Sequence, residues 1–161
     1  MAKAEAKNND TAKTEEKKTV EVATSGQYIK DLSFENPCAP EIYTINPLKP
    51  EIKVSVDINA KKLQENTFEV ELIINATAEH DKKVMFILEL NYAGIFTIKN
   101  PVNEQQLQEI LFVYCPSLMF PFARRIIADT TRDASMPPLM LNTINFGALY
   151  ESKKDSIQKI K

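Results

Sequence analysis

The sequence predicts an α+β protein in which helices cover one face of a four-stranded antiparallel sheet. Apolar and polar residues alternate with a period of two in four segments between residues 27 and 92, and after residue 103 the apolar spacing becomes helical. Strands that precede the helices, rather than alternating with them, are typical of this layering. A chain of 161 residues is long enough to bury the core of one such domain.

Both ends of the chain are polar. Residues 1–18 contain five lysines, four acids and a single large apolar residue, Met1, so we expect a disordered tail there. The folded domain is expected over residues 19–150. Residues 151–161 form a second polar end, in which Ile157 and Ile160 could extend a helix.

The four alternating segments are expected to be strands at residues 27–35, 51–58, 67–78 and 83–92. Short polar links near residues 64–66 and 80–82 predict hairpins between the second, third and fourth strands. In the fourth strand, Leu88, Leu90 and Tyr92 are expected to face the helices, while Ile87 and Glu89 point outward.

Strict alternation also assigns the two faces of the first strand. Its packed face is expected to hold Tyr28, Leu32 and Phe34. Its outward residues are Ile29, Asp31, Ser33 and Glu35. Two carboxylates four residues apart on one strand face would project about 13 Å from each other.

A proline-rich loop separates the first two strands. Its prolines fix φ and remove backbone donors, which indicates a stiff, extended connection: Pro37, Pro40, Pro47 and Pro50. It also carries four large apolar residues, namely Ile42, Tyr43, Ile45 and Leu48. We expect this crossover loop to lie over the sheet edge and the following helix, near Phe120 and Phe122.

The helical half begins at a plausible cap, Asn103, and continues with apolar residues spaced three and four apart. Pro116 is expected to interrupt or kink this helix. Pro137 and Pro138 impose an extended break, and a final helix is expected to start near Asn145.

The residues for catalysis or metal binding are scarce. The chain has one histidine, His80, in a predicted polar turn, only three glycines, and no Cys–His pairing at metal-ligand spacing. Cys38 and Cys115 are interpreted as free thiols. We therefore expect no enzyme, no cofactor and no metal site.

Charge and hydropathy exclude further classes. Residues 19–150 carry 16 acids against 11 bases, which disfavours nucleic-acid binding and favours a cationic partner. No uninterrupted apolar run reaches about 18 residues, so no membrane-spanning helix is expected. The amino-terminal segment lacks the apolar region of a secretory signal, which indicates a cytoplasmic protein.

Three strings in order resemble the SecB family of export chaperones. YIKDLSFENPCAP resembles the first strand and crossover loop of that family, and LNYAGIFTI resembles its fourth strand with a Gly-Ile-Phe turn. The helical half is similar almost throughout, in YCPSLMFPFARRIIADTTRDASMPPLMLNTINFGALY. The resemblance covers roughly residues 28–150.

The resemblance implies a non-enzymatic holdase that forms a homotetramer, a dimer of dimers with sheets outside and helices between them. Such proteins bind unfolded secretory precursors and deliver them to the SecA motor through its basic, zinc-bearing carboxy-terminal module. Four positions match the family's SecA-docking residues: Asp31, Glu35, Ile87 and Glu89. The helix-facing strand residues Leu88, Leu90 and Tyr92 would support subunit assembly.

The client groove is expected to consist of Ile42, Tyr43, Ile45, Leu48, Phe120 and Phe122. Two departures from the family are the absence of Trp, with Leu48 where an aromatic ring is common, and a basic carboxy-terminal tail. Two alternatives stay open: a SecB-like chaperone of a toxin–antitoxin pair, and a carrier of a hydrophobic small molecule.

Overall fold

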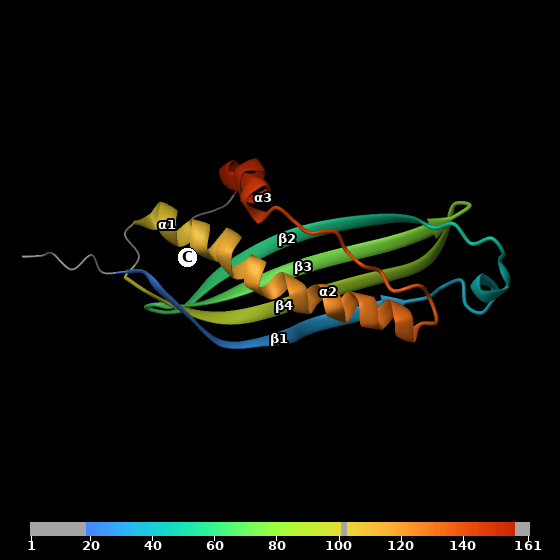
Figure 1. Cartoon of the computed structure of the whole chain (residues 1–161), viewed down its shortest axis with the longest axis horizontal. Helices are drawn as coiled ribbons and strands as arrows, with labels where there is room; N and C mark the ends of the chain where they lie inside the picture. The colour runs from blue at the N-terminus through green and yellow to red at the C-terminus, as the bar shows by residue number, and fades with distance from the viewer. Residues whose placement is uncertain (1–18, 101–102, 157–161) are drawn as a thin grey trace, which may run out of the picture.

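The computed structural model describes residues 19–100 and 103–156. Four strands form one antiparallel sheet in the order β1-β4-β3-β2, and helices cover one of its faces (Figure 1). The strands are β1 (Glu21–Glu35), β2 (Glu51–Gln64), β3 (Thr67–His80) and β4 (Lys83–Lys99). The predicted fold class is confirmed, while the expected disordered tail at residues 1–18 lies outside the described residues.

Both predicted hairpins are present, each with a two-residue connection. In the β3–β4 turn, Asp81 and Lys82 have φ values of 47° and 64°. Positive φ at both central positions gives a turn whose twist matches that of the flanking strands. The β2–β3 register runs from Glu51 opposite Glu79 to Gln64 opposite Thr67, with one irregularity near its end.

The first strand departs from strict alternation because it contains a β-bulge at Lys30. Ile29 pairs with Tyr92 and Asp31 pairs with Asn91, so Lys30 is the extra residue. The bulge reverses the facing of residues 26–29, and a second irregularity between Thr24 and Gly26 restores it nearer the start of the strand. Tyr28 therefore lies on the outer face and Ile29 on the helix-covered face, and the sequence prediction for these two residues was wrong.

The fourth strand is longer than expected and runs through Gly94 to Lys99, so the Gly-Ile-Phe segment is not a turn. Gly94 lies on the helix-covered face opposite Val70. A Cβ at this position would stand 2.7 Å from Cε2 of Phe96 and 3.3 Å from Sδ of Met119. The glycine thus allows a large ring and a helix to approach the strand closely.

One long helix crosses the sheet without interruption. It consists of α1 (Glu104–Glu109), a π-helical turn η2 (Ile110–Tyr114) and α2 (Cys115–Asp133). Of the two outcomes expected at Pro116, an interruption or a kink, the interruption is absent, and a local irregularity of the helix is present instead. The π-helical turn lies directly before the proline, and in it the Cys115 N–H donates to the Ile110 carbonyl. This shifts the hydrogen-bond register at the point where the proline ring would otherwise clash with the preceding turn.

The helix from Glu104 to Asp133 is also long and apolar enough to cross a membrane, which counting uninterrupted apolar runs had missed. Half of its most apolar stretch is buried inside the protein. The core helix of a globular domain has the same length and composition, so this property does not indicate membrane insertion.

Two asparagines begin helices as predicted. The Asn103 side chain accepts a hydrogen bond from the Gln106 N–H at 2.8 Å, and that of Asn145 accepts one from the Ala148 N–H at 3.0 Å. Asn145 starts α3 (Phe146–Lys153), which continues into a short 3₁₀ turn, η3 (Lys154–Ser156). Between α2 and α3, an extended segment returns over β2 and β3 (Figure 1).

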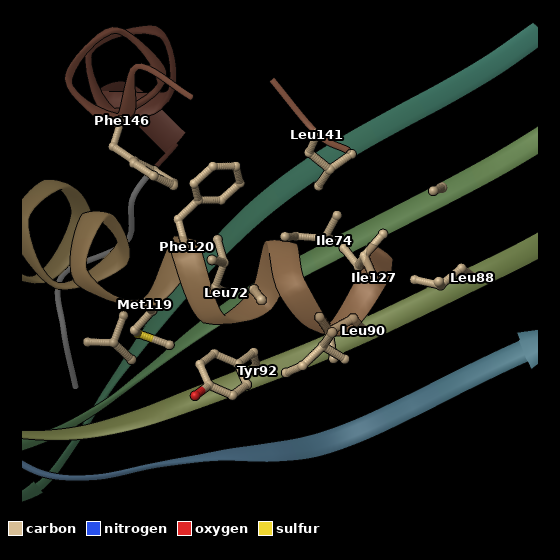
Figure 2. Packing of buried hydrophobic residues seen from close by; sticks show 14 of the residues in the cluster. Leu72, Ile74, Leu88, Leu90, Tyr92, Met119, Phe120, Ile127, Leu141 and Phe146 are labelled. Atoms are coloured by element: carbon tan, nitrogen blue, oxygen red, sulfur yellow. The ribbon is translucent and has the colours of Figure 1, made fainter. Parts of the chain in front are cut away.

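The core lies between the sheet and the long helix. Leu72 and Ile74 of β3 and Leu88 and Leu90 of β4 face α2, where Ile127 packs over them (Figure 2). All five side chains are 0 or 1% exposed. The covered strands are the two central ones, and this leaves much of the same face uncovered on edge strands β1 and β2.

Candidate functional site

The four expected docking residues come together on the outer face of the sheet. Glu35 of β1 lies opposite Ile87 of β4, and Ser33 lies opposite Glu89. Asp31 lies opposite Asn91, four register positions from the Glu35–Ile87 pair and therefore on the same face. The three carboxylate residues are exposed. We call Asp31, Glu35, Ile87 and Glu89 the acidic surface.

The carboxylates of this acidic surface have no hydrogen-bond or ion-pair partner among the described residues. The acids on β3 differ, because Glu69 and Glu71 bind Lys30 and Glu79 binds Lys53. Unpaired carboxylates on a flat, solvated surface attract a cationic partner over roughly 8 Å at physiological salt. The geometry therefore suits a basic ligand, while the docking role itself stays a prediction.

Beside the acidic surface, polar side chains connect two strands that are not neighbours. Tyr28 of β1 donates a hydrogen bond to Glu69 of β3 at 2.5 Å, and Lys30 Nζ lies 3.0 Å from Oε2 of Glu69. Lys30 also donates to Glu71, as does Asn91 Nδ2 at 2.9 Å. We call these five residues the outer bridge.

The outer bridge changes the titration of its members. The hydrogen bond from Tyr28, opposed by burial and assisted by Lys30, lowers the pKa of Glu69 below its ordinary value. The same hydrogen bond raises the pKa of Tyr28. Hydrogen bonds to Glu71 and Glu69 raise the pKa of Lys30, so all three groups are held in the charge states that favour the bridge.

A small residue lies beneath the outer bridge. Ala93 of β4 stands between Tyr28 and Glu71 in the register, on the same outer face. It is 0% exposed although it belongs to the solvated face. The long side chains from β1 close over it, which a larger side chain at this position would prevent. Sequence alternation marks Ala93 as outward-facing but does not indicate that it is covered.

The residues expected to support assembly lie where the sequence predicted. Leu88, Leu90 and Tyr92 face the helix layer and are buried (Figure 2). Burial raises the pKa of Tyr92, partly offset by the nearby Arg125. The helix above them has an uncovered apolar face, with Tyr114, Leu118 and Phe122 spaced four residues apart and all exposed. Their part in assembly stays a prediction.

The crossover loop docks at the carboxy-terminal end of α2. It contains the 3₁₀ helix η1 (Glu41–Thr44), and the hydroxyl of Tyr43 donates to the Ala134 carbonyl at 2.9 Å. Ile42 is 2% exposed and belongs to the core. Leu48 is half-buried against the core, and Ile45 is exposed.

The structure does not bring this loop next to Phe120 and Phe122. Ala134, where the loop docks, lies 14 residues beyond Phe120, or about 21 Å along a helix. Phe120 is buried and packs edge-on against Phe146 of α3, with 5.9 Å between the ring centroids. Phe122 is exposed. The six expected groove residues are thus distributed over two regions.

Sequence reasoning missed other uncovered apolar residues. Ile52 and Val54 of β2 alternate as a packed face should, yet they are 40% and 44% exposed. They directly follow the crossover loop on an edge strand, at the end of β2 that the loop enters. Met140, in the extended segment after α2, is also exposed. One feature of the sequence indicated this exposure: a predicted four-stranded sheet is wider than a single helix can cover.

A separate groove of about 860 Å³ lies between the start of β1, the long helix and α3. Its lining is mixed, with Val22, Ile110 and Tyr150 beside Glu109 and Glu151. It is open along its length, unlike the enclosed apolar pocket with converging polar groups that a small-molecule carrier uses.

His80 has a structural position. Its Nδ1 lies 3.0 Å from the Lys49 carbonyl, which ties the end of the crossover loop to the β3–β4 hairpin. The histidine is half-buried and is the last residue of β3, beside the predicted turn rather than within it. Within residues 19–100 and 103–156, no group of three metal-ligating side chains is present. Both cysteines are free, Cys115 buried and Cys38 partly so.

Comparison with protein families finds one that matches nearly the whole chain. The model described as "Preprotein translocase subunit SecB" matches residues 14–157. Curated relatives named "Protein-export protein SecB" include one from Rickettsia peacockii, 45% identical over 94% of this chain and 97% of its own length. Another, from Maricaulis maris, is 49% identical over 79% of this chain and 73% of its own length.

A solved structure shares the fold at much lower identity. It is a SecB-like chaperone of Mycobacterium tuberculosis bound to a peptide from an antitoxin, with a TM-score of 0.64 and 12% identity. The match covers 76% of this chain and 90% of that one. At this identity the likeness supports the arrangement of sheet and helices and nothing about ligands.

Proposed function

The chain belongs to the SecB family of preprotein-export chaperones, and from this premise we propose that it is a non-enzymatic, cytoplasmic holdase that passes unfolded secretory precursors to SecA. The observation that carries the proposal is the acidic surface. Asp31, Glu35 and Glu89 are exposed on one flat face without partners among the described residues. A basic, zinc-bearing module of SecA has the complementary charge.

Binding of the SecA carboxy-terminal peptide tests this docking. We expect the zinc-loaded peptide to bind, with an affinity that falls as salt is raised. The double variant Asp31→Lys/Glu35→Lys should abolish binding. Glu51→Lys/Glu104→Lys, at exposed positions outside the acidic surface, is the charge-matched control. Equal binding by both variants would contradict docking at this surface.

For clients, we propose that exposed apolar residues in the crossover loop (Ile45) and in the adjoining end of β2 (Ile52 and Val54) take part. Leu48, half-buried, would complete this surface. A client segment that buries three large side chains there would gain about 5–9 kcal/mol before ordering costs, at about 1.5–3 each. Ordering the client removes much of this, so each contact is weak and release stays easy.

A reduced, unfolded precursor and its folded form provide the client test. Light scattering should show a complex with the unfolded form alone. Ile52→Ser/Val54→Ser should weaken that complex, whereas Ile52→Leu/Val54→Leu should preserve it because the surface stays apolar. A complex with the folded precursor as well would contradict the holdase proposal.

For assembly, we propose the homotetramer, a dimer of dimers, that the family resemblance implies. The uncovered helix face of Tyr114, Leu118 and Phe122 supports this, since exposed apolar stripes on soluble proteins mark interaction surfaces. Light scattering of Leu118→Glu should show a smaller species than the unsubstituted chain. An unchanged mass would indicate that this face is not the interface.

The alternatives are less well supported. The antitoxin-bound structure is 12% identical, whereas the relatives named for protein export are 45–49% identical. A toxin–antitoxin role therefore has no specific support. The small-molecule carrier would need an enclosed apolar site, and the described groove is open with two glutamates in its lining.

A further inference from the structure

We propose that the outer bridge is a positioning device for the acidic surface: by tying Tyr28 and Lys30 of β1 to Glu69 and Glu71 of β3, it sets where Asp31 presents its carboxylate. The inference rests on the docking role proposed above. Lys30 is a cation beside an acidic surface that would bind a basic ligand. The inference gives it a positioning role, which accounts for a charge that would otherwise oppose binding.

The position of the bulge is the first reason. Lys30 is the extra residue of the bulge and immediately precedes Asp31. Within the described residues, β1 is an edge strand of the sheet and pairs with β4 alone. A one-residue slip would turn Asp31 to the opposite face. Contacts from Lys30 across β4 to β3 oppose that slip.

The hydrogen bonds of Asn91 are the second reason. Asn91 is the register partner of Asp31, and its amide donates to Glu71. Lys30 donates to the same Glu71 carboxylate. The residue before Asp31 and the residue opposite it are therefore fixed to one acceptor, and the backbone on two sides of Asp31 is held from β3.

The third reason concerns charge. A lysine next to Asp31 lowers the negative potential that would attract a basic module. If electrostatics alone mattered, removing Lys30 would strengthen docking. If positioning matters more, removing it weakens docking. The two explanations predict changes of opposite sign, so one substitution separates them.

The experiment measures the affinity of the zinc-loaded SecA carboxy-terminal peptide for variants of the full chain. We expect Lys30→Met to weaken binding about three- to tenfold, a change on the scale of coupled contacts. Tyr28→Phe, which leaves the charge unchanged, should weaken it by a smaller factor. Lys30→Arg should retain near-normal binding, since the guanidinium can still reach both carboxylates.

Lys53→Met is the matched control. Lys53 lies on the same outer face, in β2, which does not pair with β1, and among the described residues it pairs only with Glu79 at 3.2 Å. Its removal deletes the same charge without disturbing the bulge, and binding should stay equal or become slightly tighter. Hydrogen exchange should quicken at residues 29–33 in Lys30→Met and not in Lys53→Met.

Asp31→Asn tests the docking proposal separately from the positioning inference. If Asp31→Asn weakens binding while Lys30→Met binds as tightly as Lys53→Met, the positioning inference is wrong and the docking proposal stands. If Asp31→Asn has no effect, both are wrong. Should Lys30→Met fail to fold, Tyr28→Phe decides: unchanged affinity and unchanged exchange at residues 29–33 would overturn the inference.

Discussion

The phenol of Tyr28 on β1 donates a hydrogen bond to the carboxylate of Glu69 on β3, although β4 lies between the two strands. Backbones two strands apart are separated by about 10 Å, so the contact requires a long donor and a small residue beneath it. Ala93 is that residue. Glu69 is consequently only 8% exposed, although it belongs to the outer face of the sheet.

Glu69→Gln should make stability less dependent on pH in the acid range. The folded-state pKa of Glu69 lies below its ordinary value of 4.5, so its ionised form stabilises the fold above that value. This contribution is lost as pH falls from about 4.5 through the lower folded pKa. We expect the variant to be about 1–3 kcal/mol less stable at pH 7, with the difference shrinking on acidification.

Urea unfolding at fixed protein concentration measures this difference, because assembly makes stability concentration-dependent. Glu79→Gln is the control, since in the described part of the chain Glu79 pairs only with the exposed Lys53, and its loss should change stability by less than about 1 kcal/mol. A gap between wild type and Glu69→Gln that stays constant down to pH 3 would contradict the argument.

Gly94→Ala should destabilise the protein by about 1–3 kcal/mol, the usual penalty for overpacking a core. The new methyl group would meet the Phe96 ring at 2.7 Å. Gly26→Ala is the matched control, because its Cβ would meet nothing within 4 Å and its φ is not positive. That control should be neutral or up to about 1 kcal/mol stabilising. Similar unfolding midpoints for both variants would contradict the prediction.

Thr131→Val should cost about 1–3 kcal/mol, although the two side chains have nearly the same shape. The Thr131 hydroxyl donates to the Ile127 carbonyl and accepts from the Leu139 N–H at 2.9 Å, which ties α2 to the extended segment. Valine would leave that N–H without its partner.

The neighbouring Thr130→Val is the control for this change. The Thr130 hydroxyl donates to the Ile126 carbonyl, its one partner among the residues described, and a helix carbonyl also accepts a backbone N–H. We expect its effect to stay below about 0.5 kcal/mol. If thermal or urea unfolding shows the same loss of stability for both variants, the hydrogen bond from the Leu139 N–H does not account for the stabilisation by Thr131.

Cys115 should not react with a thiol reagent in the native protein. It is fully buried, and this burial raises the pKa of its thiol to about 12. At pH 8 roughly one thiol in 10,000 would be ionised, and the reagent cannot reach it. In Cys38→Ser, we expect reaction only after unfolding in guanidinium chloride.

The reciprocal variant, Cys115→Ser, keeps the partly exposed Cys38 of the crossover loop. It should react measurably under native conditions. Rapid native reaction of Cys115 in the Cys38→Ser variant would show that α2 separates from the sheet, and would contradict the packing described here.

Much of the fold followed from local patterns. Alternation located β2, β3 and β4 and placed Leu88 and Leu90 on the covered face, because a strand side chain has only two directions to point. Asn103 and Asn145 marked helix starts through their capping chemistry. The parity of Ile87 and Glu89 likewise assigned them to the outer face.

The misses have specific causes. Alternation failed for Tyr28 and Ile29 because one unpaired residue, Lys30, reverses the facing of the residues between it and a second irregularity near Gly26. Pro116 has no backbone N–H to donate, yet the helix continues through it because the π-helical turn before it changes the hydrogen-bond register. The crossover loop was expected near Phe120, but its position could not be predicted because local sequence patterns do not indicate which part of the helix a 15-residue connection contacts.

The sequence by itself determined the family, the order of the elements and the facing of Leu88, Leu90 and Tyr92 on β4, since these depend on local chemistry and on short-range periodicity. Only the tertiary structure decided that Tyr28 reaches Glu69, that the crossover loop docks at Ala134, and that Ile52 and Val54 stay uncovered. These relationships depend on strand order and register, which bring together residues more than 40 positions apart and leave the edge strands beyond the width of one helix.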